Sequence, residues 1–332
     1  MEKVKTFKRY RFNEAIRAQV FKHTISQKTN NTHGLLSLIE DWSIIFLSIY
    51  TSKYVYAHHH TYFLLPLMAY FIAICIIGAR QRGLADCLHL ATHYCFASNQ
   101  YINFVLGTFT SGYLIFQSFH GYQVSHVRNH HPYLGTHKDP DYMSLKESGI
   151  CGEQRTKRNI QKYLRNLFSP KSSWNYLVYL IQHRIYSQEE DKYETCVRSI
   201  YLTGWLVIFV YTGNFLNLCL FWFIPYLTTH MWIGSFIELL EHYPLVETAP
   251  RVDIYMTRNR ICGWLWNFFF GVHNEHYHMI HHLFPKVPQW EFHSVHLILM
   301  QDPIYASLHE KTGWKHLLKE IIEVDGLTTM NE

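Results

Sequence analysis

The sequence predicts an all-α integral membrane protein with two transmembrane helical hairpins, four crossings in total, and a cytoplasmic helical cap. Three observations lead to this fold class. Charged residues make up only 17% of the 332 residues, whereas soluble domains have about 25%. Two long stretches are almost free of charge, and histidines gather in clusters just outside them. The mean hydropathy of -0.11 excludes a chain that lies wholly in lipid, so apolar spans must alternate with polar segments.

Each charge-free stretch is about twice the roughly 20 residues that one membrane-spanning helix needs, so each is expected to form a helical hairpin. Residues 42–79 contain a single charged residue, and the histidines at 58–60 suggest a turn near the middle. Residues 199–237 contain none, and the pair Gly213-Asn214 is a plausible turn. Buried core helices are the alternative, because one proline interrupts each stretch.

These hairpins divide a single domain, residues 1–332, into membrane and cytoplasmic layers. The cytoplasmic segments are expected at 1–41, 80–198 and 238–332. Every Lys and Arg except Lys53 then lies on one side, which the positive-inside rule makes cytoplasmic. A third apolar run, 101–118, would place the motifs on either side of it in opposite compartments if it crossed. We therefore expect it to be an interfacial or re-entrant segment.

Net charge and cysteine spacing narrow the function classes. The net charge is +5, but the basic residues do not interleave with aromatic residues, so we expect a lipid bilayer and no nucleic acid as partner. The seven cysteines form no CxxC pair, which is typical of reduced thiols. The N-terminal region has no continuous apolar run, so we expect no cleavable signal peptide. The basic stretch RTKRNIQKYLR is either a solvated helix face or a contact for anionic lipid, an acidic electron donor or an acidic carrier protein.

Three histidine clusters are the strongest functional signal among the 24 histidines of the chain. They read HLATH, HVRNHH and HMIHH, and together they contain His89, His93, His126, His130, His131, His278, His281 and His282. Residues three and four apart share one face of a helix, so each cluster can present two or more imidazoles to one point. Neutral imidazole suits iron, zinc, copper and nickel. An HxxxH pair alone is expected by chance in so histidine-rich a chain, but two three-histidine patterns are not, which predicts a polyhistidine metal site.

The order and flanks of these clusters resemble those of the membrane fatty acid desaturase and hydroxylase superfamily. The segments HVRNHHPYLGTHKDPD and NEHYHMIHHLFPKVP are similar to the second and third histidine boxes of that family, with a predicted hairpin between them. The resemblance covers residues 40–300. It is specific for the superfamily and carries little information about the substrate.

The resemblance implies a non-haem di-iron centre, two Fe²⁺ ions ligated almost wholly by histidine. The eight clustered histidines match ligand positions, and His242 in LLEHYPL stands where the family has a ninth ligand. Asn274 matches an asparagine that precedes the third box, so it is a further candidate ligand, direct or through water. Metal-bound histidines usually donate their other ring N–H to a carboxylate or carbonyl. The candidate carboxylates, each of which is otherwise a helix cap or a surface charge, are Asp86, Asp139, Asp141, Glu241 and Glu275.

The activity that the resemblance implies is dioxygen-dependent desaturation of an alkyl or fatty-acyl chain at the cytoplasmic face of a prokaryotic cytoplasmic membrane. Hydroxylation or ketolation of an alkane, carotenoid or small secondary metabolite is the runner-up, and the substrate is free or carrier-bound. No cytochrome b5 pattern (HPGG) or GxGxxG nucleotide site is present, so electrons are expected from a separate ferredoxin, rubredoxin or cytochrome b5 with its reductase.

A metal-binding transporter or receptor without redox chemistry is the hypothesis from another class. Transport sites generally lie near the bilayer midplane on broken helices, often in repeated halves. Here the clusters lie outside the charge-free stretches and no repeat is visible, which disfavours that reading.

Overall fold

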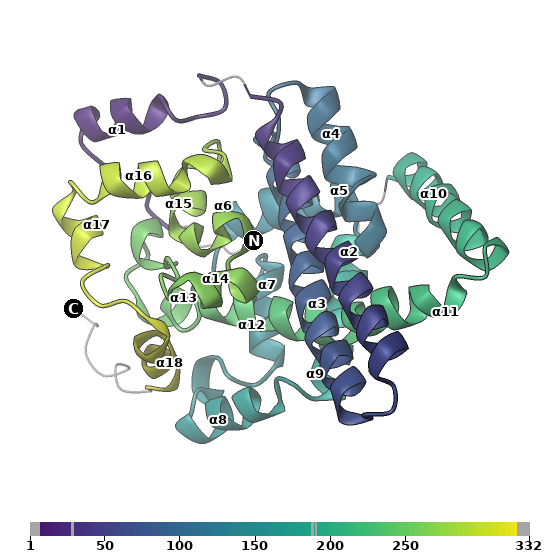
Figure 1. Cartoon of the computed structure of the whole chain (residues 1–332). Coiled ribbons are helices and arrows are strands. Elements are labelled where there is room, and N and C mark those ends of the chain that lie inside the picture. Colours follow the sequence, from purple (N-terminus) through teal and green to yellow (C-terminus); the bar gives the residue numbers. More distant parts are fainter. Residues whose placement is uncertain (1–6, 28–29, 187–188, 190, 324–332) are drawn as a thin grey trace.

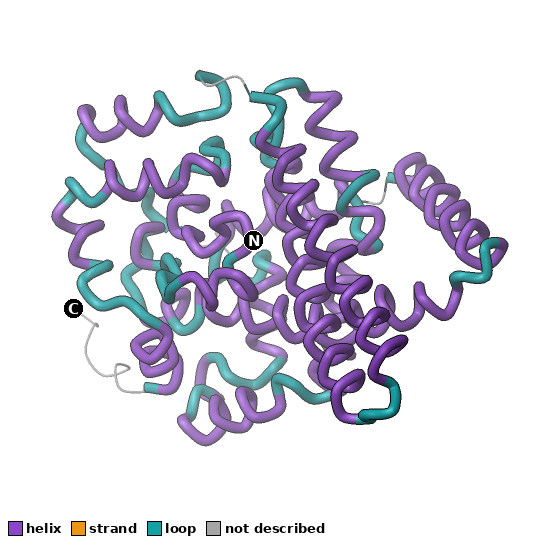
Figure 2. Tube along the Cα trace, viewed as in Figure 1, coloured by secondary structure: helices purple, strands orange, loops and turns teal. Residues whose placement is uncertain are grey.

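The computed structural model describes residues 7–27, 30–186, 189 and 191–323. Within these ranges the chain forms helices and no β-strand, and the single strand-like contact is an isolated parallel bridge between Lys8 and Val252. Figure 1 shows a long hairpin, α2 and α3, beside a cap of shorter helices, with α10 and α11 projecting on the opposite side. Figure 2 shows that short loops join the helices of the cap.

The α-helices of the described residues are α1 (Glu14–Phe21), α2 (His33–His59), α3 (Leu64–Thr92), α4 (Gln100–Thr108), α5 (Phe119–Tyr122), α6 (His131–Tyr133), α7 (Pro140–Glu147), α8 (Lys157–Asn166), α9 (Pro170–Leu180), α10 (Lys192–Tyr211), α11 (Phe215–Leu218), α12 (Met231–His242), α13 (Leu245–Thr248), α14 (Trp264–Phe270), α15 (His278–Leu283), α16 (Phe292–Leu299), α17 (Pro303–Ser307) and α18 (Trp314–Ile322). Short 3-10 helices are η1 (Gly112–Ile115), η3 (Gly152–Gln154), η7 (Asp253–Tyr255), η8 (Val272–Tyr277) and η9 (Gln289–Glu291). Segments of π-helix are η2 (Gln123–His130), η4 (Ile181–Ile185), η5 (Cys219–Phe223) and η6 (Tyr226–His230).

Two helices, α2 and α3, are long and apolar enough to cross a membrane. The chain reverses between them at residues 60–63, next to the histidine run that predicts a turn. Outward-facing apolar side chains such as Phe46, Leu47 and Phe71 are exposed in this protein, as expected for side chains that contact lipid. Both helices extend beyond the predicted hairpin 42–79, because the lack of charge marks the apolar part of a helix and not its ends.

The second half of α3 is the central element of the cap. Every residue from Ile77 to Thr92 is buried, including the charged side chains of Arg80, Arg82 and Asp86. Buried charges need partners, so this half of the helix must be surrounded by protein and not by lipid. One continuous helix therefore runs from the apolar surface into the polar interior.

The second charge-free stretch also folds into two helical runs. After α10 the chain turns at residues 212–214, where Gly213 has a φ of +69°, and a single helical run then continues from Phe215 to His242. Pro225 lies in this run between the π-helical segments η5 and η6. Because proline cannot donate the helical N–H bond, a local widening of the helix is the expected accommodation. That these two runs cross a membrane stays a prediction.

The segment 101–118 forms the short helix α4 and the 3-10 turn η1. A helix of nine residues is about 14 Å long, less than half of the roughly 30 Å of a hydrocarbon core. The buried side chain of Asn103 ties it to the end of α3, because its amide donates to the Ala91 carbonyl over 2.9 Å and its oxygen accepts from the Phe96 N–H over 3.1 Å. All seven cysteines are free.

Gly78 allows α3 to pack closely against η6, and replacing this glycine tests that packing. A Cβ atom at Gly78 would lie 2.0 Å from Oγ1 of Thr229 and 2.8 Å from the backbone nitrogen of His230. We expect Gly78→Ala to lower the free energy of unfolding by about 1–3 kcal/mol through overpacking, measured as a lower thermal midpoint in detergent.

Gly204 in α10 is the matched control, because a Cβ there meets no atom within 4 Å. Gly204→Ala is expected to raise stability by about 0.5–1 kcal/mol through helix propensity. A Gly78→Ala protein that melts at or above the wild-type temperature would contradict the close approach of these helices.

Candidate metal centre

Five elements bring the nine predicted histidines into one buried region between α3 and the cap. His89 lies in the last turn of α3 and His93 at its C-cap, while His242 ends α12. The remaining six come from η2, the start of α6 and α15. His89 and His282 are about 190 residues apart in the sequence, so only the folded helices bring the nine histidines together.

Their ring nitrogens form two separate groups. One consists of His89, His93, His126, His131 and His281, and the other of His130, His242, His278 and His282. Within each group the candidate ligand atoms all lie within 4.8 Å of one another. Each group is therefore compact enough for its imidazoles to share one metal ion.

His281 is the hub of the first group. Its Nε2 atom lies 2.8 Å from Nε2 of His89, 2.9 Å from that of His131 and 3.3 Å from that of His126. In the second group, Nε2 of His278 lies 3.0 Å from Nε2 of both His242 and His282. The imidazoles thus point the same ring atom toward a common centre.

The π-helical geometry of η2 determines which of its histidines joins which of the two groups. In an α-helix His126 and His130 would occupy one face, but η2 is π-helical, with about one more residue per turn. His126 consequently faces His131, five residues on, with 3.0 Å between their Nε2 atoms, while His130 joins the other group. In α15 the spacing is α-helical, so His278 and His282 stay together.

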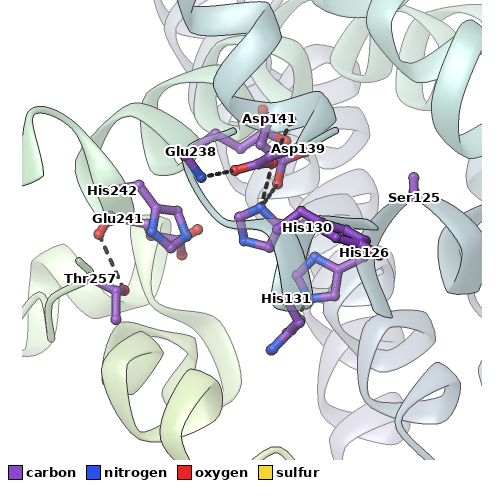
Figure 3. A network of polar contacts seen from close by, with 12 residues as sticks. Ser125, His126, His130, His131, Asp139, Asp141, Glu238, Glu241, His242 and Thr257 are labelled. Atoms are coloured by element: carbon purple, nitrogen blue, oxygen red, sulfur yellow. Dashed lines mark hydrogen bonds and ion pairs between the residues drawn. The ribbon is translucent and has the colours of Figure 1, made fainter. Parts of the chain in front are cut away.

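Carboxylates and a carbonyl hold the outer nitrogens of four ligating candidates. Nδ1 of His89 lies 3.1 Å from Asp86, Nδ1 of His278 lies 3.2 Å from Glu241, and Nδ1 of His242 lies 3.2 Å from the Met256 carbonyl. His130 has two such partners, Asp139 at 2.8 Å and Asp141 at 3.2 Å, and Figure 3 shows both carboxylates on one side of its ring. An acceptor at Nδ1 places the proton there, so the inward Nε2 keeps its lone pair.

Electrostatics favours a cation where these lone pairs meet. Burial, together with the neighbouring imidazoles, lowers the pKa well below its usual value for His126, His131, His278, His281 and His282, so these rings are neutral. Burial also acts on His130, but Asp139 and Asp141 outweigh it and raise its pKa to about 9. The buried Nε2 of His93 has no hydrogen-bond partner among the described residues. The neutral imidazoles of the two groups are a donor set that fits a first-row transition metal.

The other predicted site residues occupy the surroundings of the two groups. Asp86, Asp139, Asp141 and Glu241 contact the histidines as described above. Glu275 instead pairs with Arg82 and lies 3.9 Å from Arg260. Asn274 belongs to neither group, and its side chain donates to the Gln289 carbonyl over 3.2 Å.

A buried network of arginines behind the carboxylates is absent from the sequence-based prediction. Arg260, only 1% exposed, donates to Glu241 over 2.9 Å and to the carbonyl of Glu275 over 3.2 Å. Arg82, on α3, binds the Glu275 carboxylate. On the other side Arg184 lies 3.4 Å from Asp141. A charge next to an apolar stretch is a weak signal for Arg82, but no local pattern distinguishes Arg260 or Arg184 from surface arginines.

A helical chain with two membrane-length helices and two buried histidine groups that could hold metal is typical of a membrane metalloprotein. Comparison with known proteins gives the family: the fatty acid desaturase family model matches residues 65–313. The chain belongs to the fatty acid desaturase family, and it is a desaturase-type oxidoreductase.

Two relatives illustrate the range of that similarity. The chain is 33% identical over 303 residues to the dihydrorhizobitoxine desaturase of Bradyrhizobium elkanii, covering 89% of this chain and 83% of the relative. It is 20% identical over 302 residues to the chloroplastic omega-6 fatty acid desaturase of Glycine max, covering 86% of this chain and 68% of the relative.

Replacement of the hub histidine tests the ligand assignment. We expect His281→Ala to lower the metal affinity of the first group by more than the roughly 10–100-fold that loss of an outer hydrogen-bond partner costs, because three imidazoles converge on its Nε2 atom. Elemental analysis of the purified, iron-reconstituted protein measures the change.

His59→Ala is the control, since His59 is exposed at the end of α2 and far along the chain from every cluster. Its metal content is expected to equal that of the wild type. Full metal content in His281→Ala would refute the assignment.

Proposed function

We propose that this protein is a di-iron desaturase of the membrane, with one iron ion in each histidine group. The observation that carries the proposal is the convergence of nine imidazoles on two points while carboxylates hold their outer nitrogens. Histidine ligands suit iron, and the desaturase family supplies the redox chemistry that a zinc site lacks. The substrate class is an alkyl or acyl chain.

The reaction removes one hydrogen from each of two adjacent carbons. Two bound irons would supply the chemistry by which dioxygen, two electrons and two protons are converted with these hydrogens into two waters, leaving a carbon–carbon double bond. The chain's own contribution is positioning. Asp86, Asp139 and Glu241 keep the Nδ1 protons in place, so that each Nε2 stays a metal donor throughout the reaction.

The electrons are proposed to come from a separate ferredoxin, rubredoxin or cytochrome b5 with its reductase. The helix α8 supports this proposal, because Lys157, Arg158, Lys162 and Arg165 are exposed on it and only Ile160 is buried. An exposed basic surface attracts an acidic protein partner and speeds its association.

Four membrane crossings with a cytoplasmic site are proposed for the topology. The exposed apolar side chains of Ile200, Val207 and Val210 on α10 support a lipid environment for the second hairpin as well as the first. The positive-inside rule places the basic segments, and with them the histidines, on the cytoplasmic side.

Turnover of the reconstituted enzyme tests the reaction. Iron-loaded protein with dioxygen, a reduced ferredoxin system and a panel of alkyl and acyl substrates is expected to yield a product lighter by two hydrogens, read by mass spectrometry. A product heavier by one oxygen atom would instead identify the enzyme as a hydroxylase. Inactivity of the iron-loaded protein on every substrate would contradict the proposed substrate class.

Labelling of the two helix turns tests the topology. Cysteines introduced at Thr61 and at Gly213, in a background without native cysteines, are expected to react with a membrane-impermeant maleimide added outside intact cells. A cysteine introduced at the exposed Arg158 of α8 is the control and should react only after the cells are opened. Protection of position 213 in intact cells would rule out the second hairpin.

A further inference from the structure

An apolar cavity of about 740 Å³ lies between the two helical hairpins, and none of the nine candidate ligand histidines lines it. Helix α2 forms one wall and α10 the opposite wall, and Figure 1 shows α10 standing apart from α2 on the side away from the cap. Residues of η1, α11 and η5 complete the lining. Most of the lining side chains are aromatic or aliphatic, among them Ile49, Phe209 and Phe221. The cavity therefore suits an apolar ligand.

Two stacked tryptophans form the wall of the cavity that faces α3. The rings of Trp42 and Trp222 lie 5.5 Å apart, with 6° between their planes. Their indole N–H groups donate to the carbonyls of Thr110 over 3.0 Å and Leu114 over 2.9 Å. Behind them the Trp222 carbonyl accepts from Gln81 of α3 over 3.0 Å, and none of the described residues of α3 lines the cavity. This wall separates the cavity from the helix that carries the HLATH cluster.

The wall formed by α10 needs a packing partner. Tyr201, in the first half of α10, contacts the rest of the chain, because its hydroxyl donates to the Phe109 carbonyl over 2.6 Å. Further along α10, Trp205 and Leu206 line the cavity and are 42% and 41% exposed. An empty space of this volume deprives both walls of dispersion contacts, and an apolar cavity does not hold water. An alkyl chain in the cavity would supply the missing contacts between α10 and α2.

A single cation stands at the end of the cavity beside the two helix turns. Lys53 lines this end, six residues before the end of α2, and its ammonium group donates to Oδ1 of Asn217 over 3.4 Å. Asn214, next to the turn after α10, also lines it. Residues 42–79 and 199–237 contain no Asp or Glu that could neutralise this charge. A cation within the membrane needs a partner, so this end of the cavity favours an anionic group.

The length of the cavity along α2 fits one leaflet of a bilayer. Trp42 and Lys53 are eleven residues apart in the sequence, which is about 16 Å along a helix. The hydrocarbon core of a bilayer is about 30 Å thick, so this length is about half of it. An anionic group at Lys53 with an alkyl chain along the rest of the cavity is the arrangement of a phospholipid.

We propose that the cavity binds one anionic phospholipid from the leaflet at the helix turns. Its phosphate accepts hydrogen bonds from the Lys53 ammonium group, and one acyl chain fills the space between α2 and α10 as far as Trp42. The bound lipid would join the second hairpin to the first. This site rests on the proposed four-crossing topology and not on the desaturation reaction, because the tryptophan wall separates it from α3.

Native mass spectrometry of the delipidated full-length protein in detergent tests the site. The probes are palmitoyl-oleoyl-phosphatidylglycerol, the matching phosphatidylcholine, and palmitate. No electron donor is present, so a failure of desaturation leaves the result unaffected, and the cysteine labelling at Gly213 reports a failure of the topology independently. We expect one phosphatidylglycerol per chain and at least tenfold weaker binding of phosphatidylcholine. Tighter binding of palmitate, or equal affinity for the two phospholipids, would overturn the proposal.

A variant that fills the cavity localises the acyl chain. Leu206→Trp adds a large side chain to the lining, so it should weaken phosphatidylglycerol binding at least tenfold. Val207→Trp is the matched control, because the neighbouring Val207 is 59% exposed and does not line the cavity. Its affinity for phosphatidylglycerol should equal that of the wild type.

Two variants of Lys53 localise the phosphate. Lys53→Gln removes the cation and should abolish the preference for phosphatidylglycerol over phosphatidylcholine, whereas Lys53→Arg should keep it. Because Lys53 is exposed, neither change disturbs the protein core. Unchanged phosphatidylglycerol affinity in both Leu206→Trp and Lys53→Gln would place the lipid elsewhere and refute the site.

Discussion

The convergence of neutral imidazole nitrogens on two buried points is the constraint on which the rest of this structure depends. In the first group the Nε2 atoms of His89, His126 and His131 lie 2.8 to 3.3 Å from that of His281. Imidazole lone pairs held this close repel one another in a low-dielectric protein interior. A cation at each point would convert that repulsion into coordination. Every outer nitrogen that donates to a carboxylate or carbonyl, such as Nδ1 of His89 toward Asp86, helps to keep the inner lone pair available.

The carboxylates that hold the histidines create a second requirement, because each is itself buried and a buried carboxylate needs polar partners. Arginines supply these partners: Arg260 pairs with Glu241, and Arg184 pairs with Asp141. Arg82 pairs with the neighbouring Glu275. Burial of ion pairs costs desolvation energy that hydrophobic packing would not, so such pairs are weak evidence for stability. Their placement directly behind the candidate ligand histidines suits a positioning role, since a shell of fixed groups holds those side chains in one geometry.

The sequence predicted the membership of the centre better than its internal arrangement. The six histidines of the second and third clusters stood out because two three-histidine patterns exceed chance, whereas His89, His93 and His242 were identified through the order of the clusters and the family resemblance. The division of the nine histidines between two groups could not be predicted, because the rule that residues four apart share a face fails in the π-helix η2, where His126 pairs with His131. Arg260 could not be predicted either, since its partners come from other segments of the chain and no local pattern marks a buried arginine. The sequence did not predict the helix ends, because a stretch without charge marks the residues that contact lipid and not the full length of a helix.

The two halves of α3 combine these requirements in one helix. Its first half is apolar and exposed, as contact with lipid demands, and its second half is buried and carries Arg82, Asp86 and His89. A helix is rigid along its axis, so the distance from the apolar surface to the first ligand is fixed by the backbone and not by loops. A chain-like substrate held at that boundary would keep its apolar part among apolar side chains while its polar end meets polar ones.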